Sequence, residues 1–220
     1  DAGAQEINLI IKDAGKTLIQ VVDDGCGMTS IDARMCFERH ATSKISKAED
    51  LFAIKTMGFR GEALASIAAI AHLELKTRVH DEELGTKIII EGSSLKTQEA
   101  CQCDAGTNIM IKNLFFNVPA RRNFLKSHAA ETRHIYEEFI RVAMVNPDIE
   151  FSLTNNDKIV YKLEKGSFKF RLVSIYGKIY DQRIIHIEQK TDLVSISGFI
   201  GKPEFAKKTR GEQSFFVNGR

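Results

Sequence analysis

The sequence has 220 residues, of which 43% are apolar and 27% are charged, and its formal net charge is +2. This composition is typical of an ordinary folded protein with one large or two modest domains. No run of about eighteen apolar residues occurs, so no transmembrane helix is predicted, and a net charge this small does not by itself indicate a nucleic-acid partner.

The ends of the chain and its cysteines say little about function. No secretory signal pattern is present and the first residue is Asp1, so we expect the chain to begin inside a longer polypeptide. Cys26, Cys36, Cys101 and Cys103 show neither a C-x-x-C nor a zinc-finger spacing. Unpaired thiols in a reducing cytoplasm are therefore expected, and no metal site is predicted from these residues.

The first third of the chain predicts a hairpin followed by helices. Ile7, Leu9 and Ile11 alternate with polar neighbours, and a turn at 13–16 separates them from the apolar run 18–22. The elements expected next are a helix over 31–38 that begins with the capping-box pair Thr29 and Asp32, a loop over 39–46, a short helix near 48–54 and a buried apolar helix over 62–71.

The rest of the chain divides into two parts. Up to residue 165 the pattern predicts strands at 73–78, 86–91 and 108–112, an irregular stretch at 114–122, a helix from about 129 to 145, and a hairpin that turns at 155–157. Short β-like runs then follow at 171–176, 184–187, 194–200 and 214–218. We place a domain boundary between 1–165 and 166–220, and expect the second domain to be incomplete.

One glycine cluster follows the end of a predicted strand. In Asp23-x-Gly25-x-Gly27 the carboxylate is placed to accept a hydrogen bond from the amine of adenine, while the glycines let backbone approach the base. A tight turn with a surface aspartate is the alternative, and so short a motif does not decide between them.

A second glycine cluster precedes the helix expected at 62–71. Gly58 and Gly61 flank an arginine there, and free N–H groups at a helix start favour a phosphate. A plain helix entry is the alternative interpretation. Together with the polar loop at 42–44, the two clusters indicate an adenine end and a phosphate end of one nucleotide site.

A third candidate for phosphate binding is rejected. Gly15-Lys16-Thr17 matches the last letters of a P-loop, but the first glycine of that motif would stand at position 10, which is Ile10. The lysine also lies in a hairpin turn instead of between a strand and a helix, so a solvated turn is predicted.

Six strings in chain order resemble the motifs of the MutL family. They are residues 1–4 (DAGA), 23–28 (DDGCGM), 39–45 (RHATSKI), 58–64 (GFRGEAL), 116–126 (FNVPARRNFLK) and 217–220 (VNGR). The D-x-G-x-G pattern is shared with other ATPases of the GHKL superfamily, namely the gyrase-type, chaperone and sensor-kinase ATPases. The strings RHATSK, GFRGEAL and PARRxFLK are far more specific to the family.

The resemblance implies an α/β (α+β) fold. A Bergerat-fold two-layer sandwich, with helices on one face of a mixed sheet, is expected for 1–165 as a GHKL-type ATP-binding domain without its first helix. Part of a ribosomal-S5-like α/β domain is expected for 166–220.

The resemblance also implies a role for each matching residue in binding ATP. Asp23 would hold the adenine amino group. The base pocket would be lined by Gly27 and Met28, Gly106 and Thr107 would lie beside the adenine, and Gly25 is expected in the same nucleotide-binding site. A mobile lid over the phosphates would include Thr42, Ser43 and Lys44. The triphosphate would contact Gly58, Phe59, Arg60, Gly61, Ala63 and Leu64.

No catalytic and no metal-binding residue is expected within the chain. In the family, the glutamate that activates water and the asparagine that holds Mg²⁺ lie on a helix just before the motif that starts here at Asp1. The lysine that reaches the γ-phosphate is expected beyond Arg220. ATP and Mg²⁺ are thus expected for the parent protein, whereas these 220 residues alone should not turn over ATP, because loss of a general base by itself costs about 10²–10⁴-fold.

The function implied is that of an ATP-driven conformational switch in DNA mismatch repair. Two copies would associate when nucleotide binds, and the switch would couple a mismatch-recognition protein of the MutS type to downstream repair factors on DNA. Such a protein works in the bacterial cytoplasm at the nucleoid, or in a eukaryotic nucleus, and needs no membrane.

Two other functions are weighed against this one. An ATPase subunit of a type II topoisomerase would share the fold, but the string PARRxFLK is not expected there. A DNA-binding scaffold with a degenerate nucleotide pocket is the other, and the intact Asp23 and both glycine clusters argue against it.

Basic side chains gather at two places. Arg121, Arg122 and Lys126 lie beside phenylalanines, and we favour a loop with core aromatics and locally paired arginines over a DNA contact. The other cluster, which lies in a predicted exposed loop and is the better candidate for DNA phosphates, comprises Lys202, Lys207, Lys208 and Arg210. Glu62, at a helix start, is expected to stabilise the helix dipole or pair with Arg60 and not to act as a catalytic acid.

Overall fold

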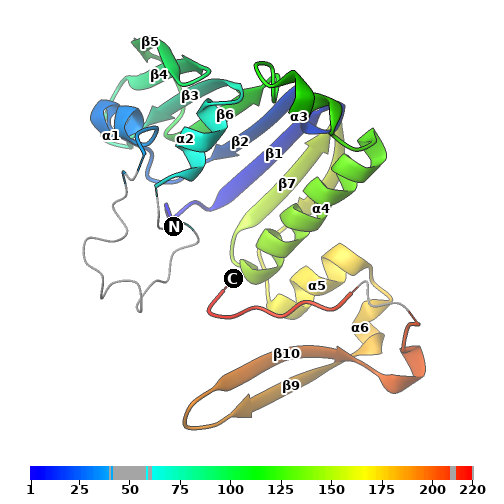
Figure 1. Ribbon diagram of the computed structural model, residues 1–220. Coiled ribbons are helices and arrows are strands. Elements are labelled where there is room, and N and C mark those ends of the chain that lie inside the picture. Colours follow the sequence, from blue (N-terminus) through cyan, green and yellow to red (C-terminus); the bar gives the residue numbers. More distant parts are fainter. Residues whose placement is uncertain (40, 42–57, 59–60, 209–211, 220) are drawn as a thin grey trace.

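The computed structural model describes residues 1–39, 41, 58, 61–208 and 212–219, and within them eight strands form one mixed sheet (Figure 1). These strands are β1 (Glu6–Lys12), β2 (Leu18–Asp23), β3 (His72–Arg78), β4 (Gly85–Glu91), β5 (Ser94–Cys101), β6 (Gly106–Lys112), β7 (Glu150–Asn155) and β8 (Lys158–Leu163). Their spatial order is β5-β4-β3-β6-β2-β1-β7-β8, and only β1 and β7 pair in parallel. Sequence-distant strands are therefore neighbours in the centre of the sheet.

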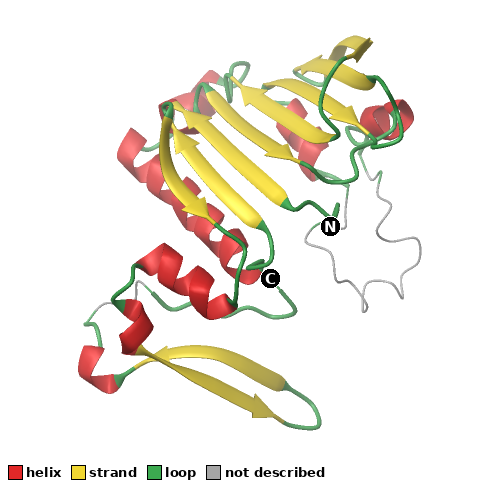
Figure 2. Ribbon diagram, turned by 180° about the vertical axis from the view of Figure 1, so that it is seen from behind, coloured by secondary structure: helices red, strands yellow, loops and turns green. Residues whose placement is uncertain are grey.

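Helices cover one face of this sheet (Figure 2). The described helices are α1 (Ser30–Met35), α2 (Ala63–Ala68), α3 (Pro119–Asn123), α4 (His128–Val145), α5 (Phe168–Tyr176) and α6 (Tyr180–Arg183), with 3₁₀ turns η1 (Asp13–Gly15) and η3 (Pro203–Phe205). A separate antiparallel pair follows, formed by β9 (Ile184–Lys190) and β10 (Ser195–Gly201). The expected two-layer α/β sandwich with a mixed sheet is confirmed. No helix among the described residues combines the length and the apolar character that a membrane span requires.

The core lies between the sheet and the helices, in two clusters. Leu73 and Leu75 of β3 and Ile88 of β4 are almost fully buried against α1 and α2. Phe151 and Leu153 of β7 are buried against α4 in the second cluster. Alternate residues of each strand point to this face, so every second side chain becomes core.

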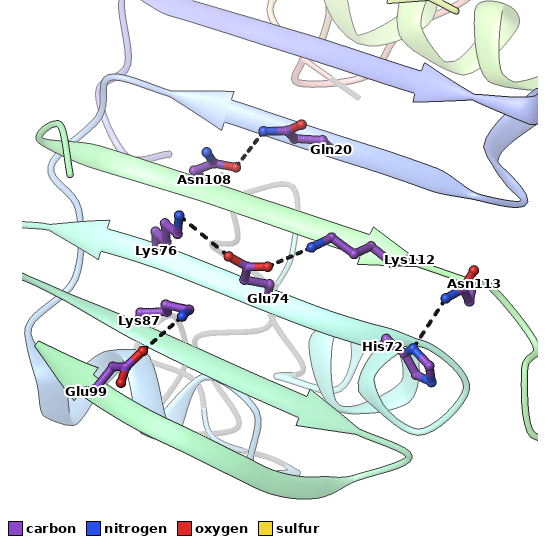
Figure 3. Close-up of polar contacts among 9 residues, drawn as sticks. All are labelled: Gln20, His72, Glu74, Lys76, Lys87, Glu99, Asn108, Lys112 and Asn113. Atoms are coloured by element: carbon purple, nitrogen blue, oxygen red, sulfur yellow. Dashed lines mark hydrogen bonds and ion pairs between the residues drawn. The ribbon is translucent and has the colours of Figure 1, made fainter. Parts of the chain in front are cut away.

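The opposite face of the sheet carries paired polar side chains, most of them from neighbouring strands (Figure 3). Glu74 lies between Lys112, whose Nζ is 2.7 Å from its carboxylate, and Lys76, at 3.6 Å. The hydrogen bond from Lys112 holds the pKa of Glu74 below its ordinary value. Gln20 donates to Asn108 at 3.0 Å further along the same face. Each exposed pair contributes little to stability, but together they make this a face that is compatible with water.

Helix α4 begins and ends where the sequence indicates. Ser127 accepts a hydrogen bond from the backbone N–H of Ala130 at 3.3 Å, and Glu131 reaches back to the N–H of Lys126 at 2.7 Å. The N–H of Ala130 in the first turn and the N–H of Lys126 just before the helix both gain an acceptor in this way. The helix ends at Val145, before Asn146 and Pro147.

Removal of this cap is expected to destabilise the chain measurably. Ser127→Ala should lower the free energy of unfolding by about 1 kcal/mol, because one N–H of the helix start loses its acceptor. Urea unfolding of the 220-residue chain measures this, with Ser127→Asp as a matched variant that keeps an acceptor. An unchanged unfolding midpoint for Ser127→Ala would contradict the assigned cap.

Two elements before residue 166 differ from the prediction. Strand β5 was not predicted, since its sequence SLKTQEAC lacks the alternation of a half-buried strand; it forms because β4 offers it an edge. The stretch 114–122 was predicted to be irregular, yet α3 begins in it with Pro119 at the first helical position, where no N–H donor is required. Helices α1 and α2 are also shorter than the expected 31–38 and 62–71.

Two predicted strands after residue 166 are wrong. The stretch 171–176 belongs to helix α5, which Ser167 caps by accepting from the N–H of Phe170 at 3.2 Å. Residues 214–218 form no strand, and Phe215 and Val217 there are largely exposed. Both stretches are rich in apolar β-branched and aromatic residues, which favour a strand. The described fold offers neither stretch a neighbouring strand with which to pair.

A completely buried arginine holds α5 against the sheet domain. Arg171 donates hydrogen bonds from Nη1 and Nη2 to five backbone carbonyls in the last turn of α4, after α4 and before α5, namely those of Ala143 (2.6 Å), Asn146 (3.3 Å), Pro147 (3.3 Å), Ile149 (2.6 Å) and Glu164 (3.1 Å). Its guanidinium also lies 5.4 Å from the ring centroid of Phe151. One side chain therefore ties together the end of α4, the loop before β7 and the end of β8.

Candidate nucleotide-binding site

Four polar side chains form a row across the helix-covered face of the sheet. Asp23 of β2 lies opposite Thr107 of β6, Thr107 lies opposite Thr77 of β3, and Thr77 lies opposite Thr86 of β4. Directly opposite residues of antiparallel strands point to the same face. The same face of β3 carries the core residues Leu73 and Leu75, so this polar row closes one end of the core.

Asp23 is the charged member of the row. Its Oδ1 accepts a hydrogen bond from the N–H of Gly25 at 2.9 Å, and the N–H of Thr107 also stabilises the carboxylate. Burial nevertheless raises the pKa of Asp23 above its ordinary value of 3.8, with a further contribution from neighbouring Asp24. The result is a half-buried carboxylate that is anchored by backbone and retains acceptor capacity for a ligand.

This raised pKa predicts a pH dependence of ligand binding. A ligand that donates to Asp23 requires the ionised carboxylate, so its affinity should begin to fall at a pH above 3.8 and approach a tenfold loss per pH unit below the pKa of the free protein. The sign is opposite for folding: since burial disfavours the charge, protonation of Asp23 by itself stabilises the folded chain as the pH falls. ADP titrations between pH 4 and 8 measure the affinity. The matched Asp23→Asn variant should lack this dependence, and a wild-type affinity that is flat across the range would contradict the assignment.

The glycines around Asp23 allow the chain to pack closely on itself. Gly27 has a φ of +67°, and a Cβ there would lie 2.0 Å from the carbonyl oxygen of Arg78. Gly106 has a φ of +110°, and its Cβ would lie 2.1 Å from the carbonyl oxygen of Asp23. Both positions therefore exclude any side chain. The expected approach of the glycine loop to a base stays a prediction; the structure adds that these two glycines also pack on neighbouring backbone.

The N-terminal segment lies against the glycine loop. Asp24 accepts hydrogen bonds from the N–H groups of Gln5 and Glu6 at 2.7 and 2.9 Å, and these bonds hold its pKa below the ordinary value despite some burial. Cys26 donates its N–H to the carbonyl of Ala2 at 2.9 Å. The motifs at 1–4 and 23–28 are thus joined, and Asp24 is a structural residue that the sequence analysis missed.

A cavity opens between the N-terminal segment, the end of β2 and the residues that precede β7. It has a volume of about 310 Å³, which lies at the lower end of the range for small-molecule sites. Its lining residues are Asp1, Ala2, Gly3, Ala4, Gln5, Ile7, Val21, Asp23, Asp148 and Ile149. Of the residues expected to bind nucleotide, Asp23 is the one in this lining, so the cavity extends from the base end of the candidate site towards the N-terminal segment.

The expected phosphate end is described in part. Gly61 has a φ of +63°, and a Cβ there would lie 2.1 Å from the carbonyl oxygen of Ala41, so the strings at 39–45 and 58–64 are in contact. Leu64 of α2 and Met28 of the glycine loop pack against the same core cluster, so one cluster positions residues from both the base end and the phosphate end of the expected site. Ala63 opens α2, and Gly58 is exposed. The expected site residues outside the described part of the chain are Thr42, Ser43, Lys44, Phe59 and Arg60.

The two basic clusters differ in their surroundings. Arg121 and Arg122 of α3 are exposed, and Phe124 beside them is 87% exposed, so the expectation that the aromatics here are core is wrong for Phe124. Lys207 forms an ion pair with Glu212 and donates to Tyr180 Oη at 2.7 Å, and these contacts raise its pKa. The other members expected at this second cluster are Lys202, which is half-buried, Lys208, which is exposed, and Arg210, which lies outside the described residues.

The fold is that of an ATPase domain in solved structures. The structure of the MutL ATPase domain of Aquifex aeolicus complexed with ADP matches with a TM-score of 0.66 and 27% identity, over 86% of this chain and 66% of that one. The N-terminal domain of a DNA repair protein matches with a TM-score of 0.76 and 22% identity, over 93% of this chain and 64% of that one, and so supports the fold alone. The chain therefore has the fold class of the MutL ATPase domain.

Sequence relatives then give the family. The DNA mismatch repair protein MutL of Christiangramia forsetii is 57% identical over the whole chain, and that of Bacteroides fragilis is 56% identical. A family model described as the C-terminal domain of DNA mismatch repair proteins matches residues 172–220. The chain belongs to the MutL family of DNA mismatch repair proteins. It spans about a third of the length of these relatives, 36% and 35% respectively.

Proposed function

We propose that this chain binds ATP as the nucleotide-holding part of a DNA mismatch repair ATPase. The observation that carries the proposal is the anchored carboxylate of Asp23, half-buried beside a cavity at the end of β2. An ionised carboxylate in this position accepts from the exocyclic amine of adenine. The MutL ATPase domain of Aquifex aeolicus, which shares the fold, was solved with ADP, and this supports a nucleotide as the ligand.

We assign the nucleotide to residues 1–165 and the start of an S5-like domain to 166–220. The change from the eight-stranded sheet to a separate two-stranded sheet supports a boundary here. The family model that matches from residue 172 onward supports it too. Arg171 then lies at the junction, since it is in the first helix after the boundary and contacts the last elements before it.

Hydrolysis is assigned to the parent protein. The resemblance places the glutamate that activates water and the asparagine that holds Mg²⁺ before Asp1, and a lysine for the γ-phosphate after Arg220. We infer that these 220 residues bind nucleotide but hydrolyse ATP far more slowly than the parent, because a missing base alone reduces the rate by about 10²–10⁴-fold.

In the parent, ATP binding would act as a switch in mismatch repair. We infer that ATP-bound copies associate as a homodimer, which signals from a MutS-type mismatch-recognition protein to later factors on DNA, in the cytoplasm of a bacterium. The names and organisms of the relatives support repair in a bacterium. The basic stretch around the exposed Lys208 is the surface that we assign to DNA phosphates, and the exposed Arg121 and Arg122 are the second candidate.

Nucleotide titration tests the proposal. The 220-residue chain and its full-length parent are titrated with ADP and with a non-hydrolysable ATP analogue, and ATP turnover is followed for both. Binding by both proteins with Mg²⁺-dependent turnover by the parent is the expected result. Absence of nucleotide binding in both would contradict the proposed function, and parent-like turnover by the 220 residues would contradict the assignment of the catalytic groups.

A further inference from the structure

The buried hydroxyl of Thr77 connects three parts of the candidate base pocket. Thr77 is completely buried, and its Oγ1 accepts a hydrogen bond from the backbone N–H of Met28 at 2.9 Å. The same hydroxyl donates to the carbonyl of Gly106 at 2.8 Å and lies 3.3 Å from Thr107 Oγ1. Met28 belongs to the glycine loop after β2, whereas Gly106 and Thr107 open β6, so one hydroxyl joins segments that are some eighty residues apart in sequence.

We propose that Thr77 is a positioning residue that selects for an amino group on the bound base, by fixing the direction of the Thr107 hydroxyl. This inference rests on the proposed nucleotide binding and extends it to base specificity. Thr77 itself need not touch the nucleotide. It acts through Thr107, which stands beside Asp23 in the polar row.

The hydrogen-bonding capacity of a hydroxyl determines this direction. A threonine hydroxyl has one proton to donate and two lone pairs to accept with. The short bond to Gly106 uses the proton of Thr77, since a carbonyl oxygen can only accept. Met28 occupies one lone pair, so the remaining interaction of Thr77 is to accept the proton of Thr107. Thr107 Oγ1 is then left with acceptor capacity alone.

Two acceptors consequently stand next to each other at the end of the core. The Asp23 carboxylate accepts, and the Thr107 oxygen, with its proton held by Thr77, accepts too. An adenine amino group offers two N–H donors and fits such a pair, whereas the carbonyl oxygen of guanine at the same position would meet acceptors only. Without the Thr77 hydroxyl, the Thr107 hydroxyl is free to rotate and to donate a hydrogen bond. The site then discriminates less strongly against the carbonyl oxygen of guanine.

Substitution of Thr77 by valine removes the hydroxyl at nearly constant shape. In the 220-residue chain, Thr77→Val should reduce the ratio of ADP affinity to GDP affinity by about tenfold, which corresponds to about 1.4 kcal/mol. Thr77→Ser restores a hydroxyl and should restore the ratio. Thr86→Val is the matched control, because Thr86 lies directly opposite Thr77 but one strand further from β6 and Asp23. This control should leave the ratio unchanged even if it lowers the urea midpoint.

The outcomes separate this inference from the proposed function. If the wild-type chain binds ADP and Thr77→Val keeps the wild-type ratio, or if Thr86→Val changes the ratio equally, Thr77 is merely a buried structural residue and the inference is overturned. If the wild-type chain and its full-length parent both bind no nucleotide, the proposed function fails first. Should Thr77→Val not fold, Thr107→Val removes the oriented acceptor directly and carries the same prediction, with Thr107→Ser as its rescue.

Discussion

Replacement of Arg171 by methionine is expected to destabilise the 220-residue chain by about 3–5 kcal/mol or to prevent its folding. Methionine has a similar length but no donors, so five backbone carbonyls at the junction would lose their hydrogen bonds while remaining beneath α5. Burial lowers the pKa of Arg171, which shows that the fold pays a desolvation cost for this charge; nearby Asp148 partly opposes the shift.

Urea unfolding of the substituted chains measures the effect. Arg171→Lys is the graded variant: it keeps the charge, but a compact ammonium with three donors cannot span carbonyls that the planar guanidinium reaches, so an intermediate loss of stability is expected. Arg141→Met is the matched control, since Arg141 is an exposed arginine of α4 that pairs with Glu138 at 2.6 Å, and its loss should change stability by no more than about 0.5 kcal/mol. Equal stabilities for Arg171→Met and Arg141→Met would show that the buried network contributes nothing.

Replacement of Asp23 by asparagine is expected to reduce ADP affinity by about 10–100-fold without loss of stability. Asparagine keeps one oxygen that can accept from the N–H groups of Gly25 and Thr107, so the loop retains its anchor. It replaces the second acceptor by an amide NH₂, which would face the amino group of adenine donor to donor; a hydrogen bond to a charged group contributes about 1.5–3 kcal/mol. Since burial disfavours the charge of Asp23, the neutral amide should leave the free energy of unfolding equal or slightly higher.

The adjacent aspartate provides the control for this result. Asp24→Asn weakens the contacts to the N–H groups of Gln5 and Glu6, so it should lower stability while leaving the base contact in place. Calorimetric titration with ADP, combined with urea unfolding of both variants, separates the two effects. Wild-type ADP affinity in Asp23→Asn would show that the carboxylate does not hold the base.

Part of the candidate site was predictable because its motifs are continuous in sequence. The apolar run of a strand leads into Asp23, and two glycines follow. The structure places Asp23 at the end of β2, where its carboxylate accepts a hydrogen bond from Gly25 in the loop that follows. Thr77 gave one weak signal, a polar residue at a position where the alternation of β3 predicts core. Its partners could not be predicted, because pairing of β3 with β6 brings together residues that local patterns do not relate.

The sequence by itself determined the elements whose signals are local. Capping residues set the starts of α1 and α4, turn residues set the two hairpins, and the family strings indicated what the fold is for. Tertiary structure alone decided β5, a polar strand that forms because β4 offers an edge for pairing. It also decided α5, whose apolar run is equally compatible with a strand, because the helix lets Arg171 donate to buried backbone carbonyls such as that of Ile149. The physical reason is the same in each case: where local preferences are weak, the hydrogen-bond partners available in the folded chain determine the conformation.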